Sequence, residues 1–382
     1  MKAIVNGKLV FPEKIEDGVL LIEGDKIVAS GKVEIPEGAE IIDAKGLYVG
    51  PGFVDQHSHG YQQYGEGIEV KDDPVAVAMA HLKHGTTTYI PSTDYNFTYE
   101  LQMKIIDMCN AAIEEDSSNI MGIHMEGPYI NKKYGSHSEL ALTYDENQCE
   151  EMFARAAKNT KHCTYAPELP DAKKIEEKLC KYGIKGAIGH CGAGPEDIER
   201  AVANGARICT HLYDATGHFE SIEAAAKLTQ HPQDCTSDIL LAIPDLYYEL
   251  ICDSQAMHVT KYSVIRTLRT AGEDHVVLIS DATVRPAYRP DQPIDININE
   301  VGILSGSRLT ISLAVKNFIK FTGCDHRVAF KAASTNSAKA MGLFDKVGSI
   351  DAGKLANLVF VDDDFTVQRI FFKGKELEEV RN

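Results

Sequence analysis

Short apolar runs alternate with amphipathic stretches through the middle of the chain. The runs have the length and composition of buried strands, and the stretches between them repeat with the period of a helix. This alternation is typical of βα units, which build a parallel sheet. We predict eight strands, at Val54–His59, Thr87–Ser92, Ile120–Glu126, Cys163–Glu168, Ile184–His190, Ala206–His211, Tyr248–Asp253 and Val276–Asp281. The helices predicted between them include Pro74–His84, Tyr99–Glu115, Asp145–Lys158, Ala172–Tyr182, Pro195–Asn204 and Lys261–Ala271.

The two ends of the chain have a different pattern, in which glycines separate short strand-like runs. Neither end has enough apolar residues to form a core alone. We therefore predict one small β-sandwich domain built from residues 1–48 plus 346–382, and a second domain over 49–345. The strand-like runs at the two ends are Ala3–Val5, Val19–Glu23, Lys26–Ala29, Asn357–Val361 and Val367–Phe372.

Each predicted strand of the middle domain ends at, or just before, a side chain that can bind a metal or carry a proton. In a closed barrel of eight βα units, all the carboxyl ends of the strands converge on one mouth, where active sites lie. In a doubly wound open sheet, the rival architecture, eight strand ends would not face one site. We therefore predict an α/β fold with a TIM (β/α)8 barrel. The strand-end residues are His59, Asp94, Glu126, Glu168, His190, His211, Asp253 and Asp281.

Composition narrows the class of protein. A chain of 382 residues with 44% hydrophobic content has ample material for a core. A net charge of -17, from 39 basic and 56 acidic residues, argues against nucleic acid and anionic membranes as partners. No apolar stretch approaches the roughly 18 residues of a membrane span, and the first residues lack a signal-peptide core. Nine dispersed cysteines without a CxxC pair indicate reduced thiols, so we expect a cytoplasmic protein.

Histidines and a carboxylate at the strand ends predict a metal site. His57 and His59 are two residues apart on a strand, so both imidazoles project to the same face, although a hydrogen-bonded pair has the same spacing. Glu126 ends the third predicted strand, and His190 and His211 end two successive ones. Imidazole and carboxylate donors suit Zn²⁺ best, with Fe²⁺ or Mn²⁺ as alternatives.

Asp281 is the candidate catalytic base. A hydrolytic metal site needs a group that takes the proton of the attacking water and passes it to the leaving group. Asp281 directly follows an apolar strand, although a structural aspartate that caps the next loop would occupy the same place. The sequence contains no Ser-His-Asp elbow, no GxGxxG loop after a strand and no Walker lysine loop. It therefore favours metal-dependent hydrolysis.

Taken together, these motifs resemble the amidohydrolase superfamily and, within it, the N-acetylglucosamine-6-phosphate deacetylases. The resemblance extends over essentially the whole chain. His-x-His marks the superfamily, whereas His-x-Glu-Gly-Pro at the third strand is more specific to the deacetylases. The matching segments are Pro51–Asp55 with His57 and His59, His124–Tyr129, Gly189-His190, Thr210–Tyr213, Ser280–Ala282 and Gly348–Leu358.

The resemblance implies a role for each matching position. Glu126, His190 and His211 would bind the metal that holds the attacking water. His57 and His59 would bind a second ion, so that the chain would carry one or two. The products would be acetate and a free amino sugar.

The same resemblance implies that Asp281 acts first as general base and then as the acid that protonates the departing amine. It also implies a small-molecule amino-sugar substrate and assembly as a homodimer. The substrate-binding positions that it implies are Ser136, Asp214, Ala215, His258, Leu304, Ser305 and Gly306.

One departure from the family pattern bears on the substrate. Where the family has Asn-Ala followed by a phosphate-binding arginine, this chain has Asp214 and Ala215, and the next arginine is Arg266. A carboxylate at about 4 Å from a phosphate costs on the order of 1 kcal/mol in water and several in a drier site. An alternative function is therefore deacetylation of a different, unphosphorylated N-acyl substrate.

Two other classes of protein share parts of this pattern. Cyclic amidases of the dihydroorotase kind carry a lysine on the fourth strand, and the predicted fourth strand, Cys163–Glu168, has none. A non-catalytic relative would have lost metal ligands, and every ligand position is occupied here. The sequence therefore favours a deacetylase.

Overall fold

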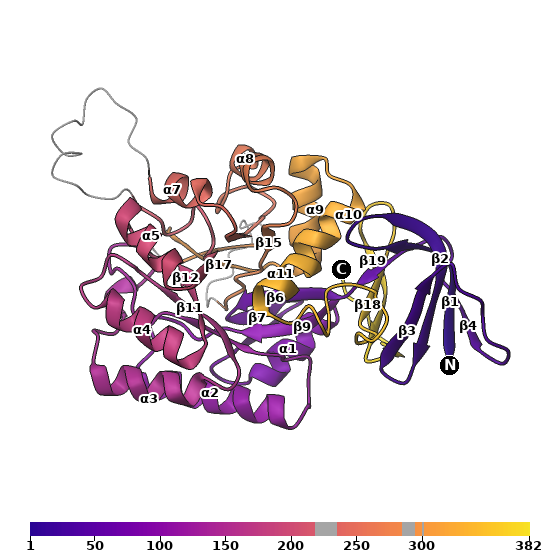
Figure 1. Cartoon of the computed structure of the whole chain (residues 1–382), viewed down its shortest axis with the longest axis horizontal. Helices are drawn as coiled ribbons and strands as arrows, with labels where there is room; N and C mark the ends of the chain where they lie inside the picture. Colours follow the sequence, from indigo (N-terminus) through magenta and orange to yellow (C-terminus); the bar gives the residue numbers. More distant parts are fainter. Residues whose placement is uncertain (218–234, 285–294, 300–301) are drawn as a thin grey trace.

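The computed structural model describes residues 1–217, 235–284, 295–299 and 302–382. One parallel sheet flanked by helices and one mainly antiparallel sheet built from both terminal regions make up the fold (Figure 1). Among the helices of the described ranges, none is both long enough and apolar enough to cross a membrane.

The strands of the parallel sheet follow one another in chain order. β6 (Phe53–Ser58) pairs in parallel with β9 (Thr86–Pro91). Six further strands pair in succession, each parallel to the one before. They are β10 (Ile123–Glu126), β11 (Thr160–Tyr165), β12 (Lys185–Ile188), β13 (Ala206–Cys209), β14 (Tyr247–Leu250) and β15 (Val276–Leu278). The eight predicted strands are confirmed, with bounds that differ by a few residues.

The parallel sheet is curled, so that its first and last strands approach each other. Two isolated parallel bridges connect β9 and β10 with their adjoining residues: one pairs Tyr89 with Ile120, and the other pairs Ser92 with His124. On the other side, the backbone NH of Asp281, after β15, donates to the carbonyl oxygen of His57 in β6 at 2.9 Å. The carboxyl ends of the strands are thereby gathered in one region.

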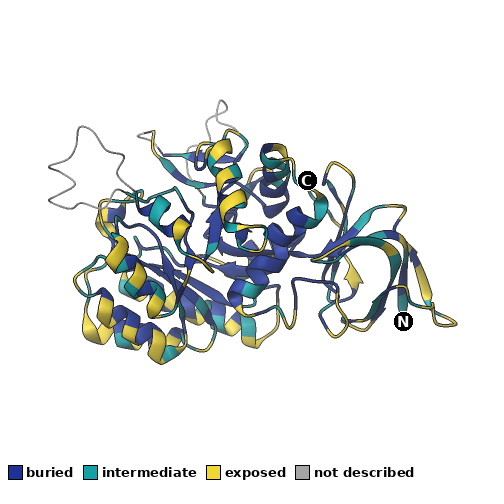
Figure 2. Ribbon diagram, turned by 45° about the horizontal axis from the view of Figure 1, so that its top comes forward, coloured by how far each residue is buried: buried dark blue, intermediate teal, exposed yellow. Residues whose placement is uncertain are grey.

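Helices cover the outer side of this sheet, and in Figure 2 their exposed residues face away from the buried strands. The six predicted helices are confirmed as α1 (Pro74–Leu82), α2 (Tyr99–Glu114), α3 (Glu146–Ala156), α4 (Ala172–Tyr182), α5 (Pro195–Ala203) and α8 (Lys261–Ala271). The other described helical segments are η1 (Ser138–Leu140), α7 (Thr236–Ala242), α9 (Ile311–Thr322), α10 (His326–Phe330), η2 (Lys331–Thr335) and α11 (Asn336–Met341).

Local sequence fixes where these helices begin. The Asp73 side chain accepts a hydrogen bond from the backbone NH of Ala76 at 2.9 Å, and Pro74 follows it as the first helical residue. Thr98 and Asp145 cap α2 and α3 in the same way. Each cap satisfies a backbone donor that the first helical turn leaves without an intrahelical acceptor.

The second sheet joins the two ends of the chain. Its strand order is β20-β19-β18-β5-β1-β2-β3, with β4 paired to β1. All five strand-like runs predicted at the ends belong to it, and Ile4, Leu20, Phe360 and Phe371 are among the residues of its own buried core. The strands are β1 (Lys2–Val10), β2 (Ile15–Glu23), β3 (Lys26–Gly31), β4 (Glu40–Asp43), β5 (Tyr48–Pro51), β18 (Leu358–Val361), β19 (Val367–Phe372) and β20 (Lys375–Glu376).

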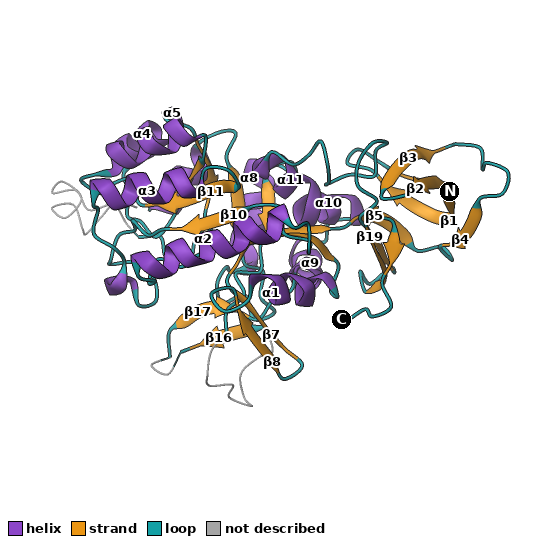
Figure 3. Cartoon of the chain, turned by 90° about the horizontal axis from the view of Figure 1, so that it is seen from below, coloured by secondary structure: helices purple, strands orange, loops and turns teal. Residues whose placement is uncertain are grey.

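Two hairpins lie beside each other near the strand ends (Figure 3). One consists of β7 (Gly60–Gln63) and β8 (Glu66–Glu69), and the other of β16 (Ile296–Ile298) and β17 (Leu304–Ser307). The side chain of Gln63 donates a hydrogen bond to the backbone carbonyl of Arg308, which ties the first hairpin to the residue after β17. Both hairpins thereby border the region where the parallel strands end.

A cluster of aromatic rings packs the terminal sheet against the parallel sheet. Phe53 of β6, Phe330 of α10 and Phe365, between β18 and β19, have ring centroids 5.0–6.1 Å apart. All three side chains are buried. Gly50 of β5 lies so close that a Cβ there would stand 2.4 Å from the Phe330 ring. This contact fixes the terminal sheet on the parallel sheet.

We expect Phe365→Ala to lower the free energy of unfolding by about 3–5 kcal/mol, because it removes a buried ring and leaves a cavity. Urea unfolding followed by circular dichroism measures the change. Tyr262→Ala, which removes a ring that is 80% exposed on α8, is the control and should change stability by at most about 0.5 kcal/mol. Equal losses for the two variants would contradict the role given to the cluster.

Candidate metal centre

The carboxyl ends of the parallel strands surround a pocket of about 210 Å³. Its lining combines imidazoles and carboxylates from the strand ends with small polar residues from the neighbouring loops. The described lining residues are His59, Asp94, Tyr95, Glu126, Gly135, Ser136, His190, His211, Asp214, Ala215, Asp281, Thr283, Ile303, Leu304, Ser305 and Gly306.

Glu126, at the end of β10, lies at the centre of the histidine cluster. Its Oε1 is 3.0 Å from Nε2 of His190, 3.1 Å from Nε2 of His211 and 3.3 Å from Nε2 of His57. Its Oε2 is 3.2 Å from Nε2 of His59. The Nε2 atoms of His190 and His211 are themselves 3.0 Å apart. The four predicted histidine ligands thus surround the fifth predicted ligand, the buried carboxylate of Glu126.

Backbone carbonyls set the orientation of two of these rings. Nδ1 of His190 lies 3.1 Å from the carbonyl oxygen of Tyr134, and Nδ1 of His211 lies 3.1 Å from that of Asp214. A carbonyl oxygen only accepts, so Nδ1 of each ring carries a proton, and in the neutral ring Nε2 then presents its lone pair to Glu126. Lone pairs that face one another are repulsive unless a cation lies between them. Two atoms bound to one tetrahedral zinc lie roughly 3.3 Å apart, close to the spacings observed here.

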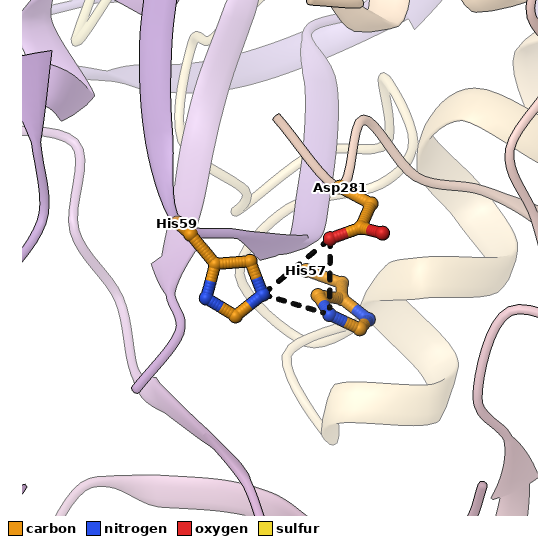
Figure 4. Close-up of side chains that lie close together, drawn as sticks. All are labelled: His57, His59 and Asp281. Carbon is orange, nitrogen blue, oxygen red and sulfur yellow. Dashed lines mark hydrogen bonds and ion pairs between the residues drawn. The ribbon is translucent and has the colours of Figure 1, made fainter. Parts of the chain in front are cut away.

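Asp281 completes the cluster from the end of the last parallel strand. Its Oδ1 is 3.4 Å from Nε2 of His59 and 3.6 Å from Nε2 of His57, and the three side chains point toward one another in Figure 4. Two overlapping groups of donors have atoms close enough to hold an ion: His57 with His59 and Asp281, and His57 with Glu126 and His211. His57 belongs to both groups, so its ring links them.

The clustered charges shift each other's pKa. Burial would raise the pKa of Glu126, but the histidines around it, His57 foremost, hold it well below its ordinary range. Burial would lower the pKa of His59, but Glu126 and Asp281 raise it to about 10. Burial would likewise lower the pKa of His211, but Glu126 raises it to about 9. The centre therefore attracts positive charge, whether as protons on the rings or as a cation between the donors.

Three of the clustered histidines and carboxylates occupy the left-handed region of backbone space. His190 has φ 48°, His211 has φ 26° and Asp281 has φ 44°. Each such residue costs about 1–3 kcal/mol unless the surrounding structure holds it in place. The chain tolerates this strain at the points where its strands end and their side chains turn into the pocket.

Most of the predicted substrate positions line the pocket. Ser136, Asp214 and Ala215 do so, as do the three consecutive residues 304–306, which are Leu304, Ser305 and Gly306. The hydroxyl oxygens of Ser136 and Ser305 are 3.2 Å apart, which joins the loop after β10 to β17. Sequence reasoning did not identify Tyr95 and Gly135, which also line the pocket and carry no metal-binding signal.

His258 and two strand-end carboxylates are not among the described residues that line the pocket. Nδ1 of His258 lies 3.0 Å from Oδ2 of Asp253, which also accepts from the backbone NH of His258 at 2.9 Å. Glu168 accepts hydrogen bonds from the Asn131 side chain at 2.8 Å and the Gly192 backbone at 2.7 Å. Asp253 and Glu168 therefore bind to their neighbours and do not join the metal cluster.

Comparison with known proteins identifies the class of protein that this fold and site define. The sequence profile of the amidohydrolase family matches residues 48–377. The match covers far more than half of the chain, which therefore belongs to the amidohydrolase family.

Several relatives carry one name. The N-acetylglucosamine-6-phosphate deacetylase of Danio rerio is 26% identical over 404 residues, covering 98% of this chain and 96% of that protein. The Homo sapiens protein of that name is 27% identical over 398 residues, with 95% and 93% covered. The crystal structure of the Thermotoga maritima protein of that name aligns with a TM-score of 0.80 at 26% identity, covering 98% and 99% of the two chains. The crystal structure of the Pasteurella multocida protein of that name aligns with a TM-score of 0.86 at 24% identity, covering 98% of this chain and 99% of that chain, which shows a common fold.

We expect Gly135→Ala to weaken divalent metal binding about tenfold or more, because a Cβ there would stand 2.6 Å from Nδ1 of His190 and displace the ring. Titration with Co²⁺ measures the affinity. Gly183→Ala is the control, since Gly183 also has positive φ but would meet no atom within 4 Å. Equal affinities for the two variants would show that His190 need not be held in this orientation.

Proposed function

We propose that this chain is a metal-dependent amidohydrolase that hydrolyses the acetamide of an N-acetylated amino sugar. The substrate proposed is N-acetylglucosamine-6-phosphate, and the products are glucosamine-6-phosphate and acetate. The observation that carries the proposal is the convergence of Glu126, Asp281 and the ring nitrogens of the site histidines beside one open pocket. The shared name of relatives aligned over nearly their whole length supports the choice of substrate. A mutant of the Mycobacterium smegmatis deacetylase, 24% identical, has been solved in complex with N-acetyl-D-glucosamine-6-phosphate.

We propose further that the curled parallel sheet is a TIM (β/α)8 barrel over 49–345, and that 1–48 plus 346–382 form a small β-sandwich domain. The consecutive parallel pairing and the hydrogen bond between Asp281 and His57 support the barrel. The separate buried core of the terminal sheet supports the second domain. A cytoplasmic location and a homodimer stay predictions of the sequence.

Under this proposal Glu126, His190 and His211 hold one divalent ion, and His57 and His59 help to hold a second. The nitrogen and oxygen donors fit Zn²⁺ first, with Fe²⁺ or Mn²⁺ as alternatives. When bound, such an ion polarises the amide carbonyl and makes a water molecule acidic near neutral pH. The protein's own part is to fix the rings, through the carbonyl acceptors at Nδ1 described above.

Asp281 handles the proton in the proposed reaction. Its carboxylate faces the pocket and takes the proton of the attacking water as general base. The same carboxyl then gives this proton to the leaving nitrogen as the C–N bond breaks. The amino sugar departs as a neutral amine, and Asp281 returns to its ionised form.

The lining serine hydroxyls are the proposed contacts for sugar hydroxyl groups. Ser136 and Ser305 can each donate and accept, and Ala215, Leu304 and Gly306 complete that wall with small or apolar surface. His258 stays a predicted substrate contact, and its buried Nε2 has no hydrogen-bond partner among the residues that the structure describes.

A second candidate function is hydrolysis of an unphosphorylated N-acyl substrate by the same chemistry. The observation that favours it is the charge of the pocket. The described lining contains the carboxylates of Asp94, Glu126, Asp214 and Asp281, and within that set there is no lysine or arginine. A phosphate placed near Asp214 is repelled by about 1 kcal/mol or more, whereas a hydroxyl or ammonium group is not.

Acetate release from a panel of N-acetyl amino sugars, each with and without a 6-phosphate, tests the proposed function. We expect N-acetylglucosamine-6-phosphate to release acetate. Activity confined to unphosphorylated substrates would establish the second candidate, and no acetate from any member of the panel would refute both.

Asp214→Asn should raise the ratio of kcat/KM for the phosphorylated substrate to kcat/KM for the unphosphorylated one by about fivefold, which corresponds to 1 kcal/mol of repulsion removed.

We expect Asp281→Asn to lower turnover by about 10²–10⁴-fold, because the amide can neither take nor return the proton. Elemental analysis should find metal still bound, since Glu126, His190 and His211 are unchanged. Glu168→Gln is the control, because Glu168 also ends a strand but bonds Asn131 and Gly192 instead. Near-normal turnover of Asp281→Asn would show that Asp281 is not the general base.

A further inference from the structure

A carboxylate buried beneath the metal centre has no part in the chemistry described so far. Glu249 lies in the middle of β14 and its side chain is fully buried. Its neighbour Tyr248 faces outward, where its hydroxyl donates to the carbonyl oxygen of Ile243 at 2.7 Å. Successive side chains of a strand point to opposite faces, so Glu249 points into the interior of the curled sheet.

Every hydrogen bond that Glu249's carboxylate makes leads toward the metal centre. Oε2 lies 3.2 Å from Nδ1 of His57 and accepts from the backbone NH of His211 at 3.4 Å. Oε1 accepts from the side-chain amide of Gln56 at 2.6 Å and lies 3.7 Å from Nε2 of His162. Gln56 neighbours His57 in sequence, so one buried carboxylate bonds to a ligand, to the residue before it and to the backbone of a second ligand.

These contacts decide which nitrogen of His57 carries the proton. An ionised carboxylate only accepts hydrogen bonds, so Nδ1 of His57 is the protonated nitrogen. In the neutral ring, the form that binds a metal, Nε2 is then left with its lone pair, 3.3 Å from Oε1 of Glu126 and 3.6 Å from Oδ1 of Asp281. A backbone carbonyl does the same for His190 and for His211. Glu249 is the charged counterpart of those carbonyls.

We infer that Glu249 is a positioning residue that holds His57 in the tautomer and orientation needed to bind metal. His57 belongs to both donor groups of the centre, and its Nε2 lies 3.3 Å from Oε1 of Glu126. The contact therefore acts directly on the ion assigned to His57 and His59, and through Glu126 on the other. Gln56 fixes the other carboxylate oxygen and keeps Glu249 from rotating away. The inference rests on the proposed metal-dependent function and deepens it, since it assigns the support of the shared ligand.

Glu249→Ala and Glu249→Gln test the inference in the full-length, metal-depleted protein titrated with Co²⁺. The affinity comes from competition with a chromophoric chelator, and the visible absorption of bound Co²⁺ reports its coordination. Glu249→Ala should weaken binding about tenfold to a hundredfold and change the visible spectrum, because His57 can then place its proton on Nε2. Glu249→Gln should fall between wild type and Glu249→Ala, since its amide oxygen still accepts from Nδ1 without the charge.

Glu176→Gln is the matched control. Glu176 is also buried, and it accepts hydrogen bonds from the Tyr165 hydroxyl at 3.2 Å and the Asn204 side chain at 2.7 Å, on α4 and away from the ligands. Its Co²⁺ affinity should stay within about twofold of wild type even where thermal unfolding shows a loss of stability.

The outcomes separate this inference from the proposed function. Wild-type affinity and spectrum in both Glu249 variants would overturn the positioning role and leave the proposed function standing. If Glu249→Ala does not fold, the comparison of Glu249→Gln with Glu176→Gln decides, and equal affinity for these two overturns the inference. A wild-type protein that binds no Co²⁺ overturns the proposed function and the inference with it.

Discussion

The crowding of histidine lone pairs around one buried carboxylate is the constraint on which the rest of the site depends. Glu126 has the Nε2 atoms of His57, His190 and His211 within 3.3 Å of one oxygen, and that of His59 at 3.2 Å from the other. Desolvation of a carboxylate is costly, and acceptors that face one another add repulsion. A divalent cation relieves both penalties at once. The arrangement therefore makes sense as a centre that is completed by a metal ion.

The fold supplies what this crowding requires. Parallel pairing fixes the ends of β10, β12 and β13 relative to one another, and the curl of the sheet brings β6 and β15 to the same place. Backbone carbonyls and the Glu249 carboxylate then fix the rings. The left-handed residues at the strand ends turn their side chains into the pocket at a cost of about 1–3 kcal/mol each. The buried cores of the two sheets offset that cost.

Most of the parallel strands, the helices and the metal-binding side chains could be predicted from the sequence, because the signals for them are local. Alternating apolar runs predicted the parallel strands, and the helical period of the stretches between them placed the helices to within a few residues. His57, His59 and Glu126 stood out because a polar side chain at the end of an apolar strand is conspicuous. Their convergence followed from the expectation that parallel strand ends meet, without any knowledge of distances.

The parts that could not be predicted depend on contacts between distant segments. Glu249 occurs in the middle of an apolar strand, and its partner His57 is 192 positions away, so no spacing pointed to it. His258 follows Asp253, the aspartate after β14. Only the structure shows that the two side chains bind each other and that His258 is not among the described residues lining the pocket. The excess of carboxylates in the described lining likewise emerges only when the loops are placed together.

Metal content tests the central claim most directly. The purified protein should hold one or two divalent ions per chain, lose them to a chelator together with its hydrolytic activity, and recover both on addition of Zn²⁺. Replacement of Glu126 by alanine should prevent that recovery, because it removes the carboxylate ligand that the proposal assigns to the first ion together with His190 and His211. Fewer than one ion per chain, with none regained on adding Zn²⁺, would contradict the account.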